Sequence, residues 1–392
     1  MPAELPHDGA VNDPLPGPPD PWAASEMPRF RSRPPYLMTE MIAAEPALAQ
    51  RLVRRLGQQD AVGSLADAIR KAMAKGRPVV ITGCGTSQHA AMAVAELLTE
   101  SVSPAAGQEI RALEALAVVR RPLDAGVLIG ISHEGGTAAT NAALEATRAA
   151  GGTTALITVG SGSPGAALAD HLVATEEQDQ SWCHTVGYLS PIVAGIVLGS
   201  RIAGARLDAA AIHALLDVAN EPRGAADVAA GLAGVDRLIV AGAGPDYVSA
   251  REMALKISEG AHLAASGLEL ETVLHGHLAA ATRWTGLVVI GTDALGTGLA
   301  AERLRRALEA ARSLSMPAAA LLDESVATTL DPALTPAGRI TLPHTGRVRG
   351  VAASLLAPIL PLQLVAERLA RARGVDPDTI GREDPAQAAA HA

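Results

Sequence analysis

The feature that most constrains the fold is an apolar run that opens into a short polar turn and then a helical segment. Residues 126–130 are apolar, residues 131–137 are rich in Ser, Gly and Thr, and residues 138–149 have helical composition. A buried strand, a small-residue turn and a helix are the repeating unit of α/β proteins. Such a turn can bind an anion, because its backbone N–H groups and the helix N-terminus face the ligand.

The same strand-and-turn unit recurs along the chain. Residues 78–82 lead into the Gly-rich turn 83–87 and a helix ending near residue 98, and residues 237–241 lead into the turn 242–245. Gly83 and Gly242 are 242 − 83 = 159 positions apart, and Ile131 and Ile290 are also 290 − 131 = 159 apart. The shared offset predicts an internal duplication. The second copy lacks the Ser/Thr cluster, so we expect only the first half to hold an anion.

Further periodic segments complete the fold prediction. We expect helices over residues 38–56 and 65–74, and strands over residues 110–119, 127–132, 154–159, 172–175 and 287–291. Strands alternating with helices predict the α/β class with doubly wound parallel sheets. Hydrophobic residues make up 48% of the chain but aromatic residues only 2%, which favours aliphatic helices packed closely on a sheet.

Composition also suggests how the chain is divided. The first 35 residues hold ten prolines and little apolar periodicity, which predicts a disordered leader. We expect a first subdomain at residues 36–221, a second at residues 222–357, and a C-terminal helix and tail at residues 358–392. Pro222-Arg223-Gly224 is the predicted linker between the subdomains.

Charge and cysteine content narrow the class of partner. The formal charge of −9 and the absence of a basic patch with interleaved aromatics argue against nucleic acid. No apolar run is expected to span a membrane, and two cysteines cannot form a disulfide framework. These features predict a cytoplasmic protein. Lysine is scarce, occurring only as Lys71, Lys75 and Lys256.

Four motifs then carry a resemblance to a known family. They are Gly83-Cys84-Gly85-Thr86-Ser87-Gln88-His89-Ala90, Ile131-Ser132-x-x-Gly135-x-Thr137, Ala254-Leu255-Lys256-x-x-Glu259 and Leu274-His275-Gly276-x-Leu278. In this order they resemble the double sugar-isomerase (SIS) domain proteins, most nearly the isomerase half of glucosamine-6-phosphate synthase. The resemblance implies two flavodoxin-like subdomains, a homodimer with a shared active site, and a phosphorylated sugar or amino sugar as ligand.

The resemblance also implies roles for individual residues. Glu259 would transfer a proton between C1 and C2 of the open-chain sugar, and His275 would assist ring opening in the active site of the partner subunit. Lys256, one helical turn before Glu259, would support its charge or contact substrate. No cofactor or metal is implied. The implied phosphate-binding residues are Cys84, Gly85, Thr86, Ser87, Ser132, His133, Glu134, Gly135 and Thr137.

Three departures from the family pattern bear on function. His133 and Glu134 replace the family's Gln-Ser in the phosphate turn, which puts an acid where a hydroxyl donor is usual. The tail, residues 374–385, contains no lysine that could form a Schiff base. No cysteine precedes Cys84, so we do not expect a glutaminase domain within this sequence.

Several alternatives remain open at the level of sequence. Glu259 could be a solvated helix residue, Cys84 a buried small residue, and His275 with His277 a metal pair that lacks a third ligand. In the acidic segment 176–185, Trp182 either fills the interface between subdomains or, with Glu134 and His184, lines a pocket for a ligand that carries an amine. The favoured function is isomerisation or deamination of a sugar phosphate. A non-catalytic sugar-phosphate sensor, or an aminotransferase supplied with ammonia by another protein, is the alternative.

Overall fold

The computed structural model describes residues 31, 33–102, 110–292, 298–344 and 346–390. The first half of the chain forms a five-stranded parallel sheet in the order β2-β1-β3-β4-β5. Its apolar central strands are buried along their whole length, because helices cover both faces of the sheet. The strands are β1 (Val79–Gly83), β2 (Ile110–Glu114), β3 (Val127–Ile131), β4 (Thr153–Thr158) and β5 (His171–Ala174).

The second half forms another five-stranded parallel sheet with the equivalent order, β7-β6-β8-β9-β10. Both sheets have the 2-1-3-4-5 order of flavodoxin-like folds, so the predicted fold class is confirmed. The strands are β6 (Arg237–Gly242), β7 (Ala265–Glu269), β8 (Thr285–Gly291), β9 (Ala318–Asp323) and β10 (Arg339–Leu342).

The duplication extends to the register of the strands. Val79 pairs with Val127 in the first sheet, and Leu238 pairs with Gly286 in the second, each across 48 positions. Gly85, which ends the first turn, has φ 57° and ψ −128°. Gly244, 159 positions later, has φ 56° and ψ −128°. Equivalent residues therefore adopt the same backbone conformation, as the shared offset in the sequence predicts.

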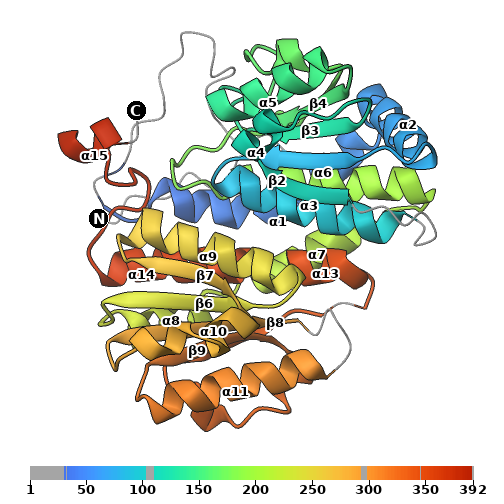
Figure 1. Ribbon diagram of the computed structural model, residues 1–392. Coiled ribbons are helices and arrows are strands. Elements are labelled where there is room, and N and C mark those ends of the chain that lie inside the picture. The colour runs from blue at the N-terminus through green and yellow to red at the C-terminus, as the bar shows by residue number, and fades with distance from the viewer. Residues whose placement is uncertain (1–30, 32, 103–109, 293–297, 345, 391–392) are drawn as a thin grey trace.

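Helices separate and flank the two sheets (Figure 1). Helices α3, α6, α9 and α14 pack on one another between them, and one continuous hydrophobic cluster includes residues from both halves of the chain. The helices of the first half are α1 (Leu37–Leu56), α2 (Asp60–Ala74), α3 (Thr86–Ser101), α4 (Ala115–Arg120), α5 (Ala138–Ala149), α6 (Val186–Ala203) and α7 (Ala209–Ala219). The later helices are α8 (Pro222–Leu232), α9 (Pro245–Ala261), α10 (Leu270–Leu274), α11 (Leu299–Ser313), α12 (Glu324–Ala327), α13 (Gly350–Leu356), α14 (Ile359–Ala372) and α15 (Pro385–Ala390).

Two local predictions are wrong. The expected strand at residues 110–119 ends at Glu114, because the Glu114 side chain accepts a hydrogen bond from the Ala117 backbone N–H and starts helix α4. The expected linker, Pro222-Arg223-Gly224, is the first turn of α8. A proline is readily accommodated at a helix start, since its missing N–H has no partner there in any case.

Two helices are long and apolar enough to differ from the expectation that no apolar run could span a membrane. Two helical segments, Val186–Ala203 and Gly350–Ala372, are long and apolar enough to span a membrane by length and composition. In each, 78% of the apolar window is buried inside the fold, which is the pattern of a core helix. The predicted leader falls largely outside the described residues.

Candidate functional site

The predicted anion turn lies at the carboxyl edge of the first sheet. Strands β1 and β3 are parallel neighbours, so the turn after Gly83 and the turn after Ile131 emerge at the same edge. Ligands of open α/β sheets bind at this edge, next to the point where the strand order reverses. Ser132 Oγ lies 3.1 Å from Thr137 Oγ1, so the two hydroxyls point to one place.

The shape of this turn depends on Gly135. Its φ is +67°, a conformation that side chains with a Cβ rarely adopt. A Cβ added there would lie 2.1 Å from Ser163 Oγ. The Gly135 carbonyl also accepts hydrogen bonds from the Gly165 backbone N–H and the Asn141 side chain. The turn is therefore held closely against the loop that follows β4.

The other predicted anion-binding residues flank α3. Gly85 is exposed and precedes the helix, and Ser87 is half-buried in its first turn. Cys84 is half-buried, with its Sγ 3.8 Å from Thr140 Oγ1. The Thr86 hydroxyl is buried and donates to Glu252 Oε1 at 3.2 Å, which directs it toward the second subdomain.

Glu252 is a functional candidate that the sequence analysis missed. It is fully buried on α9, and its other oxygen, Oε2, lies 2.7 Å from His89 Nδ1 on α3. This carboxylate therefore joins α3, which follows the Gly-rich turn after β1 in one subdomain, to α9 of the other. Its position four residues before Lys256 on a helix was the available signal, since i and i+4 share a face.

Lys256 and Glu259 form the centre of the site. Lys256 Nζ lies 2.5 Å from Glu259 Oε2 and 3.8 Å from Glu252 Oε1, and the lysine side chain is fully buried. Burial lowers the pKa of Lys256, but Glu259, Cys183 and Glu252 outweigh it and hold that pKa well above the ordinary value. The two carboxylates therefore favour the charged form of the ammonium. The Glu259 side chain is 25% exposed, so its carboxylate can reach a ligand while Lys256 holds it.

The acidic segment after β5 forms the adjoining wall. Asp179 is buried, and its carboxylate accepts hydrogen bonds from the backbone N–H groups of Ser181, Thr185 and Gly187 at the start of α6. Cys183 is also buried, with Sγ 3.9 Å from Glu259 Oε2. Burial raises the pKa of the Cys183 thiol far above its ordinary value, so it acts as a packing group and weak donor.

The two histidines beside this wall are neutral. His133 Nε2 accepts a hydrogen bond from the Asp179 backbone N–H at 2.9 Å, and the rings of His133 and His184 meet edge to face at 4.8 Å. Burial lowers the pKa of each to about 3. His133 therefore supports the wall through its ring and its acceptor nitrogen, and it adds no positive charge to the anion turn.

The Glu134 carboxyl group lies near a cation of the C-terminal tail, Arg382. Burial raises its pKa, while the nearby guanidinium of Arg382 lowers it and Asp179 raises it further. Arg382 stacks on Trp182, with Cζ 4.6 Å from the ring centre. The tail is tied to the same wall, because the Asp378 carbonyl accepts from the Trp182 backbone N–H. Arg382 thus stacks on Trp182 and lies near enough to Glu134 and His184 to shift the pKa of each, and the predicted pocket for an amine-bearing ligand stays a prediction.

His275 lies away from this cluster within one chain. Its side chain is 74% exposed after α10, and Nε2 lies 3.1 Å from Glu271 Oε2. No contact between His275 and Glu259 is present within the described part of the chain. A role for His275 therefore requires a second copy of the protein to carry it into the site, which remains a prediction.

The corresponding edge of the second sheet is closed by an internal carboxylate. Asp246, in the first turn of α9, accepts from the Thr292 backbone N–H at 3.0 Å and from its hydroxyl at 2.6 Å. Asp246 and Thr292 stand 159 positions after Ser87 and His133. A side-chain carboxylate thus fills the second-half counterpart of the turn that is predicted to bind an anion in the first half. Among the described residues, no group of three or more His, Cys, Asp or Glu could hold a metal ion.

Comparison with known proteins agrees with this geometry. Residues 72–200 match the SIS domain family model. That match lies within the first of the two subdomains, and the second subdomain has the same strand order. A comparison with curated proteins gives no significant match.

Solved structures show how far the likeness extends. The C-terminal domain of glucosamine-fructose-6-phosphate aminotransferase from Francisella tularensis is 18% identical, with a TM-score of 0.75 over 89% of this chain and 99% of that one. Tagatose-6-phosphate ketose/aldose isomerase from Escherichia coli is 17% identical, with a TM-score of 0.71 over 90% and 98%. Glucosamine-6-phosphate deaminase from Thermotoga maritima is 16% identical, with a TM-score of 0.61 over 84% and 97%.

Proposed function

We propose that this protein binds a sugar phosphate or amino-sugar phosphate at the carboxyl edge of the first sheet and transfers a proton between C1 and C2. The observation that carries the proposal is the pair formed by Lys256 and Glu259. A partly exposed carboxylate, held at 2.5 Å by a buried ammonium, lies on the helix whose Glu252 also contacts Thr86, directly after the turn at residues 83–85. Names of structurally similar proteins, an isomerase and a deaminase among them, support the same class of substrate.

In this mechanism the phosphate binds at the turn that contains Ser132 and Thr137, through hydroxyl and backbone donors. Glu259 removes the proton from C2 of the open-chain sugar, the C–H electron pair forms the C1=C2 bond, and the carbonyl oxygen at C1 takes a proton from water. The product is an enediol, or an enamine from an amino sugar. The same carboxyl group then returns the proton to C1. Lys256 holds the carboxylate in place and stabilises its charged form before the transfer. An aldose becomes a ketose when the hydroxyl at C2 gives its proton to water. An amino sugar instead gives an imine at C2, and addition of water to that imine releases ammonia and leaves the ketose.

Exchange of the C2 proton with solvent deuterium is the direct test. We expect exchange from at least one member of a panel of hexose and aminohexose 6-phosphates, and its loss, by a factor of roughly 10² or more, in Glu259→Gln. Ser258→Ala is a matched control, because Ser258 is the preceding residue on α9 and its hydroxyl accepts a hydrogen bond from the Ala265 backbone N–H, outside the Lys256–Glu259 pair. Exchange that survives in Glu259→Gln would refute the assignment.

A sensor without catalysis is the second candidate. It is favoured by the exposure of His275 and its distance from the Glu259 cluster within one chain, since a site without a ring-opening group could bind the closed sugar and leave it unchanged. Binding of a sugar phosphate in a titration, with no deuterium exchange at any protein concentration, would favour the sensor. Exchange that rises with protein concentration would favour an enzyme completed by a second copy.

A further inference from the structure

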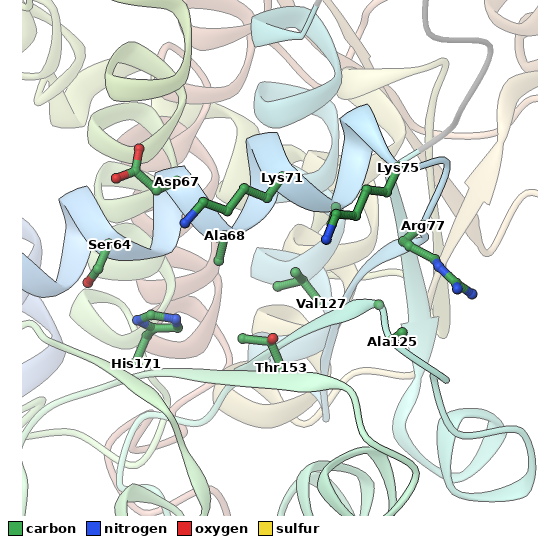
Figure 2. Close-up of a pocket in the computed structure, with 12 residues that line it drawn as sticks. Ser64, Asp67, Ala68, Lys71, Lys75, Arg77, Ala125, Val127, Thr153 and His171 are labelled. Atoms are coloured by element: carbon green, nitrogen blue, oxygen red, sulfur yellow. The ribbon is translucent and has the colours of Figure 1, made fainter.

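A second hollow lies at the opposite end of the first sheet from the candidate site. It has a volume of about 460 Å³ and lies between α2 and the amino ends of strands β3, β4 and β5 (Figure 2). These strands have four to six residues at roughly 3.3 Å each, so on the order of 15–20 Å separates the two ends. A ligand in this hollow could not touch the turn at Ser132. The lining side chains that bear on its chemistry are Ser64, Asp67, Lys71, Lys75, Arg77, Thr153 and His171.

The hollow concentrates positive charge in an acidic protein. Two of the three lysines in a chain of net charge −9 line it, and Arg77 is at its rim. Lys71 and Lys75 extend from α2 toward the space above Thr153 and His171 (Figure 2). Neither ammonium has an ion-pair or hydrogen-bond partner among the described residues. The one lining carboxylate, Asp67, pairs instead with Arg70 and points away from the hollow (Figure 2).

The helix dipole accounts for only part of this arrangement. Cations in the last turn of a helix interact favourably with its C-terminus, and α2 ends at Ala74. That effect explains Lys71 but not the approach of Arg77, from the segment before β1, and of His171, from the start of β5. Basic residues from three separate elements line one concave surface, with the Arg77 side chain at its rim and directed outward (Figure 2). A cleft with one sign of charge raises the local concentration of the opposite ion.

We propose that this hollow, defined by Lys71, Lys75, Arg77, Thr153 and His171, binds a compact anion that carries two phosphate groups. Three cationic side chains match the charge of such an anion, and lysine binds phosphate oxygens as a point charge. The hydroxyls of Ser64 and Thr153 offer further donors. The volume falls within the range of small-ligand pockets. Among the residues that the structure describes, no Phe, Tyr or Trp lines it, so these residues offer no stacking surface for a nucleobase.

Titration of the full-length chain with inorganic pyrophosphate tests the proposal by calorimetry. We expect one site, and at least about tenfold weaker binding when Lys71→Gln and Lys75→Gln are combined, since two charge-assisted contacts are removed. The pair Lys71→Arg and Lys75→Arg should restore most of the affinity. Arg206→Gln is the matched control, because it removes an exposed cation elsewhere on the surface. Circular dichroism would show that each variant folds.

The test also separates this hollow from the carboxyl edge. Ser132→Ala and Glu259→Gln should leave pyrophosphate binding unchanged if the ligand is held by the α2 lysines. The proposal is overturned if the wild type does not bind pyrophosphate at millimolar concentration, if the double glutamine variant binds it equally well, or if Ser132→Ala abolishes the binding. Deuterium exchange from a sugar phosphate is a separate readout, so either proposal can fail without the other.

Discussion

Lys256 Nζ lies 2.5 Å from Glu259 Oε2, one helical turn apart on α9, and the lysine side chain is fully buried between two carboxylates. A buried charge is tolerated only where it is paired, because transfer of an ammonium from water costs several kcal/mol. The position of this lysine is therefore determined by Glu252 and Glu259 together. The ammonium of Lys256 holds the Glu252 carboxylate inside the interface between subdomains, and it holds the Glu259 carboxylate at the surface, where a ligand can reach it.

Removal of the Lys256 ammonium should destabilise the fold strongly. Lys256→Met keeps the length of the side chain but leaves the buried Glu252 near Glu259 without its cation, so we expect a loss of about 3–5 kcal/mol in the free energy of unfolding. Urea denaturation measures this loss. Lys75→Met, at an exposed position at the end of α2, is the control and should change stability by less than about 0.5 kcal/mol. Similar stability of the two variants would show that the buried pair contributes little.

Replacement of Gly135 should disrupt the anion turn. Gly135→Ala introduces a Cβ at a φ of +67° and 2.1 Å from Ser163 Oγ, so the turn must shift. We expect a loss of roughly 2–3 kcal/mol and weaker binding of sugar phosphates. Gly160→Ala is the control, because a Cβ at Gly160 meets no atom within 4 Å. Equal effects of the two substitutions in thermal unfolding and ligand titration would argue against a special conformation at Gly135.

Glu134 and Arg382 should have opposite effects on the binding of an ordinary sugar phosphate. Glu134→Ser removes a negative charge from the turn and releases Arg382 from its electrostatic partner, so we expect tighter binding by about threefold to tenfold. Arg382→Gln removes the cation and should weaken binding by a similar factor. Fluorescence titration can follow both variants, because Trp182 lies under Arg382. No change with Glu134→Ser would count against a role for Glu134 at the ligand.

The buried neutral His133 should make stability fall as the solution becomes acidic. Its pKa is lowered from 6.5 to about 3 by burial and by His184, with Asp179 opposing. The unfolded chain binds a proton below about pH 6.5 while the folded chain does not. Stability from this group is therefore present above pH 6.5 and lost as the pH falls toward 3, at up to roughly 1.4 kcal/mol per pH unit.

The measurement compares the wild type with His133→Gln, because other buried groups also change stability with pH. Burial raises the pKa of Glu45, Asp376 and Asp378, so these carboxyl groups increase the stability of the fold as the pH falls. The difference between the two unfolding curves, recorded by urea denaturation from pH 7 to pH 4, isolates the histidine. The advantage of the wild type over the variant should shrink with acid. A constant difference over that range would mean that His133 is not held neutral.

The sequence was informative wherever a local pattern decides the structure. Helix α5 begins and ends where its periodicity predicts, at Ala138 and Ala149, because its boundaries depend on neighbouring residues alone. The 159-residue offset predicted two similar halves, and the strand register agrees. The predicted strand at residues 110–119 is longer than β2. The apolar residues after Glu114 suit a helix as well as a strand, and the Glu114 side chain caps the helix that they form.

The i, i+3 spacing predicted that Lys256 and Glu259 pair on one helix, and the sequence by itself also determined the fold class and the strand, turn and helix at residues 126–149. Only the tertiary structure revealed Glu252 as the link between subdomains and Arg382 as the partner of Glu134. The Thr86–Glu252 contact joins residues 166 positions apart, and the Arg382–Trp182 contact joins residues 200 positions apart. Neither pair leaves a periodic trace in the chain, because such contacts depend on how two separately folded sheets and a returning tail pack together.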